Sequence, residues 1–231
     1  MTEDLFKEPE GATPIDPEDA KGLIPTWVAT RGDLNAVEQE NIAKAMVWAS
    51  TNPRTRSLAS LLTEESMKTL HKRMFGDVWK WAGSYRQHDT NMGTHWPYIS
   101  TQVRELLADV LAQTANVENL PWPPDELAVR FHHRLVSIHP FPNGNGRHSR
   151  LAADLLVNVL GESAFTWGSE NLNSPGQARR AYLDALRTAD RVLDYAALVE
   201  FARSWPAGAR GLPDERPPTQ RTRPPVLRAR R

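Results

Sequence analysis

The sequence IHPFPNGNGRHSRL, residues 138–151, is the stretch on which the interpretation of the whole chain depends. His139 precedes an Asn-Gly-Asn-Gly run, and Arg147 and Arg150 follow that run three residues apart. Apolar residues recur at helical spacing on both sides, which predicts a loop between two helices. This loop is either a surface turn or a site for a phosphorylated ligand with a base beside it.

The predicted second helix, from about Arg147 to Val159, favours the phosphate site. The N–H groups in the first turn of a helix are unpaired and carry partial positive charge. Gly144 and Gly146 allow several backbone N–H groups to converge on one anion. Arg147 and Arg150 lie on one helical face, and each offers a planar fork to phosphate oxygens. The pattern is neither a Walker A loop nor a Rossmann fingerprint.

His139 ends the preceding helix, just ahead of this phosphate cradle. An imidazole with an ordinary pKa of about 6.5 is a natural proton acceptor near neutrality. A base beside bound phosphates suits phosphoryl or nucleotidyl transfer, in which a deprotonated hydroxyl attacks phosphorus. The alternative is an ordinary joint between two helices, in which His139 caps a helix C-terminus. The residues alone leave both interpretations open.

Helical periodicity dominates the rest of the chain, and we predict one all-α domain. Residues 88–100 lack this periodicity and are predicted to form a loop or short hairpin. The domain prediction is an extended arm at 1–30, a helical domain at 31–206 and a disordered Arg/Pro-rich tail at 207–231. The predicted helices cover residues 34–49, 63–83, 101–114, 124–138, 147–159, 174–186 and 194–205.

The composition is that of an ordinary globular protein, with 40% hydrophobic and 24% charged residues among 231. Lysine plus arginine and aspartate plus glutamate both number 28, so net charge gives no general attraction to nucleic acid or membrane. The absence of cysteine excludes disulfides and thiolate metal sites. Neither a signal peptide nor an apolar run of about 20 residues is present, so we expect a cytoplasmic protein without membrane contact.

The C-terminal tail differs from this average. After Gly208 it carries seven arginines against Asp214 and Glu215 and has almost no apolar residues. Such a segment cannot bury a core, and we expect a solvated tail. The alternative is a weak electrostatic contact with nucleic acid or an acidic partner.

The segment HPFPNGNGRHSR resembles the signature of the Fic/Doc family, His-Pro-Phe-x-Asp/Glu-Gly-Asn-Gly-Arg-x-x-Arg, at eight of its nine specified positions. Upstream, LHKRMFGDVWKWAGSYR, residues 70–86, resembles the family's helix ending in Trp-Ala-Gly-x-Tyr/Phe-Arg. The likeness covers about residues 63–160. The whole chain is most similar to the bacterial Fic group called mobile mystery protein B.

The resemblance implies a Fic-fold helical bundle and a protein adenylyltransferase, which moves AMP from ATP to a Ser, Thr or Tyr hydroxyl of a target protein. It implies a short β-hairpin flap at about residues 91–101 that aligns the target. The site residues implied by the family pattern are His139 as general base, Gly144, Asn145 and Gly146 as anion hole, Arg147 and Arg150 as phosphate ligands, and Gly93, Thr94 and Trp96 in the target-binding flap.

The chain departs from the family pattern at Asn143, where an Asp or Glu usually holds Mg²⁺. An amide oxygen can ligate Mg²⁺ but brings no charge, so we expect weaker metal binding, a different donor or low activity. Two other functions stay open, the first because of Asn143 and the second because of the resemblance to the Doc branch. One is a catalytically weak nucleotide-binding or partner-binding module of a toxin–antitoxin-like pair, and the other is a Doc-like phosphotransferase.

Two further site predictions concern zinc and self-inhibition. His132, His139 and His148 lack a zinc pattern, and we interpret them as partly exposed helix residues. Many Fic proteins restrain themselves with Ser/Thr-x-x-x-Glu-Gly/Asn. Residues 114–119 and 166–171 fit this pattern, but neither lies at the chain's start or end, where the family places it. We expect no built-in inhibitor, and the family implies a separate antitoxin-like regulator.

Overall fold

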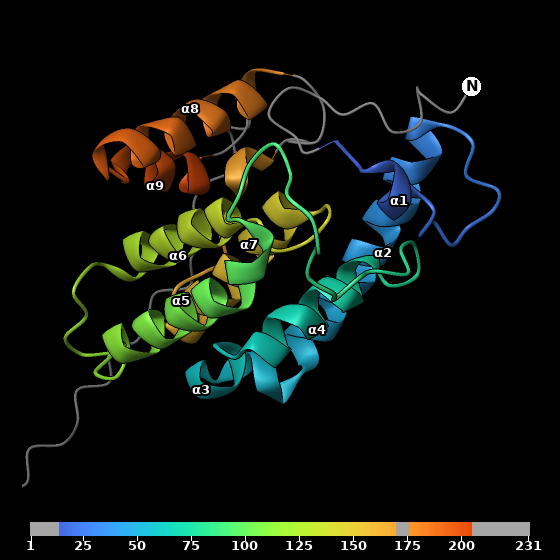
Figure 1. Cartoon of the computed structure of the whole chain (residues 1–231). Helices are drawn as coiled ribbons and strands as arrows, with labels where there is room; N and C mark the ends of the chain where they lie inside the picture. Colours follow the sequence, from blue (N-terminus) through green and yellow to red (C-terminus); the bar gives the residue numbers. More distant parts are fainter. Residues whose placement is uncertain (1–13, 170–175, 205–231) are drawn as a thin grey trace, which may run out of the picture.

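The computed structural model describes residues 14–169 and 176–204, and these ranges are helical, with one isolated β-bridge and no sheet (Figure 1). The predicted all-α class is confirmed. Residues 1–13 of the predicted arm and the whole predicted tail, 207–231, lie outside the described residues, so the domain boundaries stay predictions. The helices are α1 (Pro17–Ala20), α2 (Arg31–Thr51), α3 (Leu58–Leu61), α4 (Glu64–Phe75), α5 (Ile99–Gln113), α6 (Pro124–Ile138), α7 (Asn145–Val159), α8 (Gln177–Val192) and α9 (Ala196–Arg203), with 3₁₀ turns η1 (Pro53–Arg56), η2 (Trp96–Tyr98) and η3 (Trp167–Ser169).

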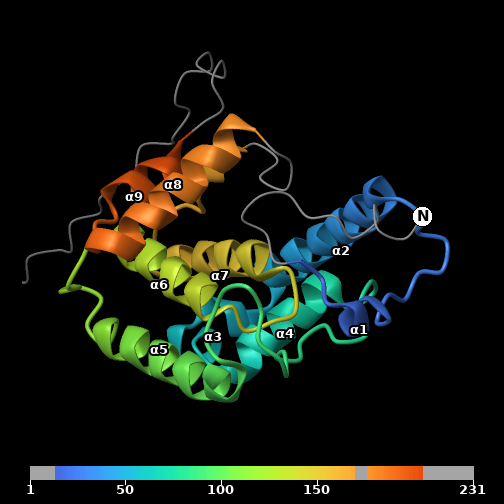
Figure 2. The same ribbon diagram turned by 45° about the horizontal axis from the view of Figure 1, so that its top comes forward.

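Helices α6 and α7 pack against each other at the centre of the fold, and the loop between them contains the opening sequence. Helices α2 and α4 form a pair that contacts α7 from one side, whereas α8 and α9 pair on the other side (Figures 1 and 2). Helix α5 packs along α6. This arrangement encloses the α6–α7 loop between helices that are far apart in the sequence.

Helix α2 begins three residues earlier than predicted because of a capping box. The Thr30 hydroxyl accepts from the Asp33 N–H, and the Asp33 carboxylate accepts from the Thr30 N–H. Its inward stripe is partly polar, since Glu38 and Asn41 are buried beside the apolar residues. Met46, an apolar residue of the same helix, is exposed.

Helix α4 ends at Phe75, whereas the sequence predicted a helix as far as Gly83. Its start is as predicted, with the Thr63 hydroxyl accepting from the Ser66 N–H. The early end has a long-range cause: residues 78–80 turn away to bond the segment 22–24. The Ile24 N–H donates to the Val78 carbonyl, and the Lys80 N–H donates to the Gly22 carbonyl. The periodicity of apolar residues along the sequence cannot predict this pairing of residues 78–80 with residues 22–24.

The segment between α4 and α5 forms a loop rather than the predicted hairpin flap. Residues 88–95 carry no strand, and residues 96–98 form the turn η2. Helix α5 then begins at Ile99, so the last residues of the predicted flap belong to a helix. We call residues 88–98 the flap segment.

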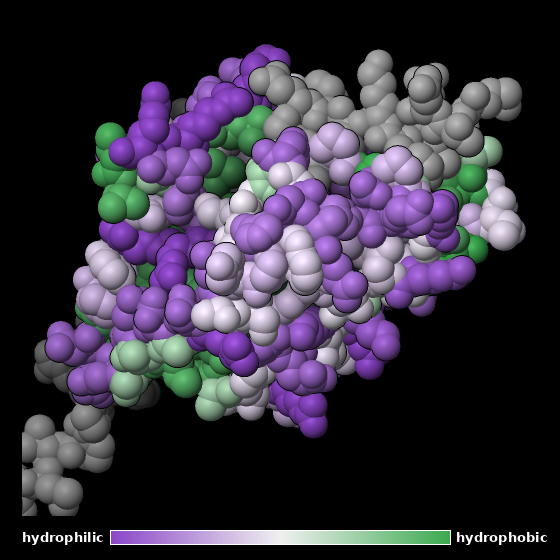
Figure 3. Space-filling model, viewed as in Figure 1, coloured by the Kyte–Doolittle hydropathy of each residue, from purple (hydrophilic) through white to green (hydrophobic). Residues whose placement is uncertain are grey.

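No helix in the described part of the chain combines the length and the apolar character that a membrane span requires. The face of the molecule seen in Figure 1 is mostly hydrophilic, and its hydrophobic residues form small separate groups (Figure 3).

Candidate active site

The loop between α6 and α7 is bent by two left-handed residues. His139 ends α6 with φ 55° and ψ 59°, and Gly144 precedes α7 with φ 78°. A Cβ at Gly144 would lie 2.5 Å from the Phe75 ring, so both the backbone angle and the space require glycine. We call residues 139–150 the motif segment. Within it, α7 begins at Asn145, two residues earlier than predicted.

Asn145 is buried and shapes this loop with its side chain. Its Oδ1 accepts from the Phe141 N–H at 2.9 Å, and its Nδ2 donates to the Phe141 carbonyl at 2.8 Å. The side-chain amide is therefore occupied by the loop. The N–H groups of Asn145, Gly146 and Arg147 lie in the first turn of α7, where a helix offers no internal acceptor. An anion at this helix end would meet these N–H groups and the positive end of the helix dipole.

His139 lies at the other end of the loop and is only 6% exposed. Its Nδ1 lies 3.3 Å from the Val136 carbonyl oxygen, so this nitrogen carries the proton and Nε2 is the proton-accepting nitrogen. Burial lowers the pKa of His139 to about 4, with the Arg86 charge acting in the same direction and the Val136 carbonyl opposing. The imidazole is consequently neutral near pH 7, which is the form a general base requires.

A second buried histidine, His71, supports the loop from α4. Its Nε2 donates to the Asn143 carbonyl at 3.0 Å, and its Nδ1 accepts from the Gly83 N–H at 3.0 Å. Its ring stacks on Phe141, with centroids 3.7 Å apart. Burial holds the pKa of His71 well below its ordinary value, so the neutral ring acts as one donor and one acceptor.

The first motif arginine, Arg147, pairs with a carboxylate from α2. Its Nη1 lies 2.6 Å from Oε2 of the buried Glu38, whose other oxygen accepts from Trp79 Nε1 at 2.7 Å. The guanidinium also lies over the Phe75 ring at 4.8 Å. Arg147 is thus a fixed group whose charge is already balanced by Glu38.

The second motif arginine, Arg150, has different surroundings. It is half-buried, and its guanidinium lies 5.4 Å from the centre of the Tyr182 ring on α8. No ion pair of Arg150 with a carboxylate occurs within the described residues. The charge of Arg150 is therefore less fully balanced by a protein carboxylate than that of Arg147, and it is better placed to pair with a phosphate group.

Asn143 does not fit a protein-held Mg²⁺ ion. Its Oδ1 already accepts from the Gly144 N–H at 2.6 Å and lies 3.3 Å from Nη2 of Arg147. A hard cation prefers several oxygen ligands including carboxylates, and here the one amide oxygen faces a positive guanidinium. Within the described ranges, no group of three or more His, Asp or Glu side chains could hold a metal ion. His132, His139 and His148 are buried, so the prediction that they are partly exposed helix residues was wrong.

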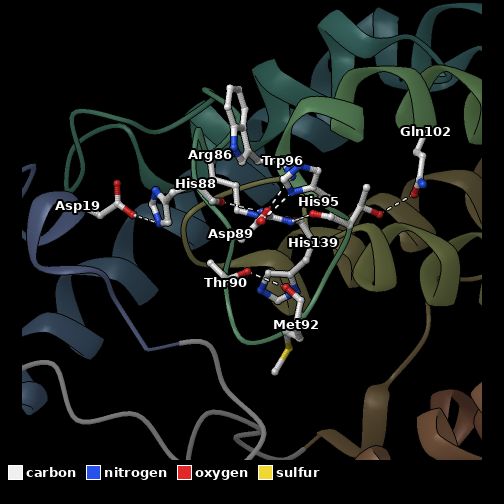
Figure 4. Close-up of polar contacts among 11 residues, drawn as sticks. Asp19, Arg86, His88, Asp89, Thr90, Met92, His95, Trp96, Gln102 and His139 are labelled. Carbon is white, nitrogen blue, oxygen red and sulfur yellow. Dashed lines mark hydrogen bonds and ion pairs between the residues drawn. The ribbon is translucent and has the colours of Figure 1, made fainter.

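Arg86, the last residue of the upstream motif, joins the flap segment to His139 (Figure 4). Its Nε donates to the His139 carbonyl and its Nη1 to the His88 carbonyl, both at 2.8 Å, and its Nη2 donates to the Thr94 carbonyl. The Thr94 N–H in turn donates to the Ile138 carbonyl at 3.1 Å. The flap segment is therefore bonded directly to the end of α6.

Asp89 organises the outer part of the flap segment. Its carboxylate accepts from the Trp96 N–H at 2.9 Å and lies 2.6 Å from His95 Nδ1 (Figure 4). The side chains of Trp96 and Tyr98 are 42% and 60% exposed. Both aromatic side chains are therefore partly exposed to solvent.

The structure thus brings the predicted residues into two adjoining groups. His139 and the first turn of α7 share one loop, Gly93 lies against His139, and the Thr94 N–H bonds to the Ile138 carbonyl. One string of the self-inhibition pattern, residues 114–119, lies in the turn after α5, and the other, 166–171, extends beyond the described residues.

Three residues that support the site had no assigned role in the sequence analysis: Glu38, His71 and Arg86. Each acts through a partner distant in the sequence, at separations of 109, 72 and 53 residues. One sequence signal was present, because Glu38 lies four residues after Leu34 on the inward side of a helix. A carboxylate at a core position is costly to bury and therefore indicates a specific partner.

Comparison with known proteins identifies related sequences. Residues 61–157 match the family described as Fic/DOC family. The chain is 33% identical over 89 residues to "Protein adenylyltransferase fic-1" of Caenorhabditis briggsae, covering 38% of this chain and 18% of that protein. It is 31% identical over 103 residues to "Probable protein adenylyltransferase y4lH" of Sinorhizobium fredii, covering 41% and 52%. The chain therefore spans about half or less of the length of these relatives.

Among solved structures, the fold is similar to that of the BepC protein of Bartonella tribocorum, described as a VirB-translocated effector with bound AMPPNP. The TM-score is 0.61 at 15% sequence identity, and the match covers 81% of this chain and 97% of that one. At this identity the likeness shows the fold, and it confirms the predicted Fic-type helical bundle.

Proposed function

Since residues 61–157 carry the sequence of the Fic/DOC family, we propose that the chain is a protein adenylyltransferase. It moves AMP from ATP to a hydroxyl side chain of a target protein. The observation that carries this proposal is one loop that places a neutral, buried His139 beside the N-terminus of α7. The relatives named as adenylyltransferases and the AMPPNP bound to the structurally similar BepC protein support it.

The proposed reaction follows from the positions of these groups. His139 Nε2 accepts the proton of the target hydroxyl, whose oxygen attacks the α-phosphorus of ATP. An oxygen–phosphorus bond forms, the bond between the α-phosphorus and the bridging oxygen breaks, and pyrophosphate leaves. The first-turn N–H groups of α7 stabilise the charge on the α-phosphate oxygens. Arg150 and Arg147 hold the phosphates further along.

Several finer points belong to the same proposal. Gly93, Thr94 and Trp96 contact the target protein. Any Mg²⁺ is held mainly by the phosphates, because Asn143 already accepts from Gly144 and faces Arg147. The proposal also includes a cytoplasmic location, which the sequence suggests, and a separate antitoxin-like regulator, which the family resemblance suggests.

The test is labelling of proteins in a cell lysate with ATP that carries ³²P at the α or the γ position. The proposal expects added protein to produce new bands with the α label and no bands with the γ label beyond those of the lysate alone. Bands with the γ label alone would instead indicate phosphoryl transfer and would contradict nucleotidyl transfer. Isothermal calorimetry with ATP and Mg²⁺ checks nucleotide binding in parallel.

A second function is favoured by the surroundings of Asn143, namely a nucleotide-binding module with little catalysis. The matched variant Asn143→Asp restores the acid of the family pattern at a position that contacts Arg147. If weak Mg²⁺ binding limits the reaction, this variant labels proteins severalfold faster at millimolar Mg²⁺. Nucleotide binding without labelling, by both the wild type and this variant, would establish the binding module.

A further inference from the structure

Arg86 is a buried cation at the junction of the flap segment and the motif segment. Its side chain is 1% exposed, and the nearest carboxylate, Asp89, lies 3.7 Å from Nη1. The guanidinium is instead surrounded by carbonyl oxygens of His88, Thr94 and His139. Burying a charge is unfavourable unless such groups compensate it, so all three carbonyls are held in place by the same cation.

These carbonyls belong to the parts of the proposed site that must be aligned. His139 bears the base, and its backbone adopts the left-handed conformation, which a non-glycine residue holds only under constraint. His88 begins the flap segment, and Thr94 lies in its middle. The Arg86 N–H also donates to the Pro140 carbonyl at 3.0 Å, which fixes the guanidinium relative to the motif loop.

The space around Gly93 shows how closely the two segments meet. A Cβ on Gly93 would lie 2.5 Å from His139 Cβ, 2.9 Å from Arg86 Nη2 and 3.1 Å from the Ile138 carbonyl oxygen. The flap backbone therefore packs directly against the Cβ of His139 and the guanidinium of Arg86. A displacement of the flap segment by a fraction of an ångström would change the distance between the flap backbone and the His139 imidazole.

We propose that Arg86 is a positioning residue for the transfer reaction, setting the distance between a target segment on the flap and the His139 imidazole. This inference rests on the proposed function. The planar fork of Arg86 spans carbonyls of both segments at once, which a lysine ammonium cannot do. Asp89 extends the same frame, because its carboxylate lies near Arg86 and accepts from the Trp96 N–H.

The experiment compares wild type, Arg86→Lys and the control Arg104→Lys. The Arg104 side chain is 64% exposed, and its Nε lies 4.0 Å from Glu64 Oε2. Labelling of lysate proteins with α-³²P ATP is measured over a range of ATP concentrations. For Arg86→Lys we expect a maximal rate about a hundredfold lower, the cost of a small misplacement, at an unchanged half-saturating ATP concentration. Arg104→Lys should match the wild type.

Hydrogen exchange supplies a readout that does not depend on catalysis. The Thr94 N–H, bonded to the Ile138 carbonyl, should exchange faster in Arg86→Lys, while amides in the middle of α7 keep their protection. Wild-type labelling together with wild-type exchange at Thr94 would overturn the proposal. If the wild type labels no protein, the proposed function fails. The hydrogen-exchange measurement then still shows whether Arg86 holds the flap segment against the motif segment.

A second variant covers the case in which Arg86→Lys does not fold. Asp89→Ala removes a carboxylate that is largely exposed and should leave the core intact. We expect faster exchange of the Trp96 N–H and a fall in maximal labelling rate of about tenfold, again at unchanged half-saturating ATP. Values equal to the wild type in both measurements would contradict the proposal.

Discussion

The motif segment, residues 139–150, and the flap segment, residues 88–98, adjoin each other but are held in different ways. His139 and Asn145 are buried, and the motif segment is bonded to α2, α4 and its own backbone. The flap segment rests on Arg86, Asp89 and one bond to Ile138, and it exposes Trp96 and Tyr98. The difference indicates that the chemistry requires a rigid frame, whereas a surface that receives a partner stays open.

The largest effect on this contrast should come from Glu38→Gln, which leaves Arg147 partly buried without its carboxylate. Removing one partner of such a pair should lower the free energy of unfolding by about 3 kcal/mol. Urea unfolding measures the loss. The control Glu40→Gln removes the exposed pair with Lys44 and should lower the free energy of unfolding far less, because solvent screens such a pair. Equal losses in the two variants would show that the motif segment is not held by Glu38.

Gly93→Ala tests the contact between the two segments. Its positive φ of 100° and the 2.5 Å approach to His139 Cβ should together cost about 2 kcal/mol and displace the flap. Gly161→Ala is a matched control, since Gly161 has φ 93° but no atom within 4 Å of the added Cβ. Thermal melting should rank Gly93→Ala below Gly161→Ala. The same melting temperature for both would mean that only backbone strain acts.

Acid should destabilise the motif side of the molecule through its buried histidines. Burial lowers the pKa of His139 and His148 to about 4 and that of His132 to about 3. The unfolded chain, with histidine pKa near 6.5, binds protons first, so stability present above pH about 6.5 is lost as the pH falls toward 4. Each histidine contributes a slope of at most about 1.4 kcal/mol per pH unit.

One buried carboxyl opposes this trend. Burial raises the pKa of Asp154 to about 7, so the folded state binds its proton first and gains stability as the pH falls. Its gain in stability offsets about the loss from one of the buried histidines, which include His71, whose pKa burial also lowers. Urea unfolding at pH 7.5, 6 and 5 should still give a decreasing free energy of unfolding. A constant value over this range would refute the burial of these neutral rings.

The smallest effect on stability should come from a substitution in the exposed part of the flap segment. Trp96→Ala removes a side chain that is 42% exposed, and its N–H bond to Asp89 involves only the backbone. The free energy of unfolding should change by about 0.5 kcal/mol or less. Labelling of target proteins should nevertheless weaken if Trp96 contacts them. A large loss of stability would show that the flap segment is part of the core.

The sequence predicted helices well where local signals fix their ends. The helix predicted from residue 63 begins after the Thr63 cap, and the helices predicted at 101–114 and 124–138 correspond closely to α5 and α6. It was wrong where distant segments compete with local preference: α4 stops at Phe75 because residues 78–80 bond to residues 22–24. The prediction of a hairpin in the flap segment was also wrong. Arg86 holds this segment as a loop by donating to the carbonyls of His88 and Thr94, and a pattern of side chains in the sequence cannot reveal bonds to backbone carbonyls.

The candidate site shows the same division. A continuous motif identified His139, the glycines and both arginines. The supports His71 and Glu38 reach the motif segment from other helices, and their roles required the tertiary structure. The occupied side chains of Asn145 and Asn143 likewise follow from contacts within a folded loop.

The central claim is that His139 activates a hydroxyl for transfer of AMP. Mass spectrometry of lysate proteins incubated with ATP and either wild type or His139→Ala tests it most directly, with calorimetry to verify that both bind nucleotide. The account predicts target proteins carrying one added AMP with the wild type, and a yield lower by about 10²–10⁴-fold with His139→Ala. Equal AMP addition by both proteins, or none by the wild type despite nucleotide binding, would contradict it.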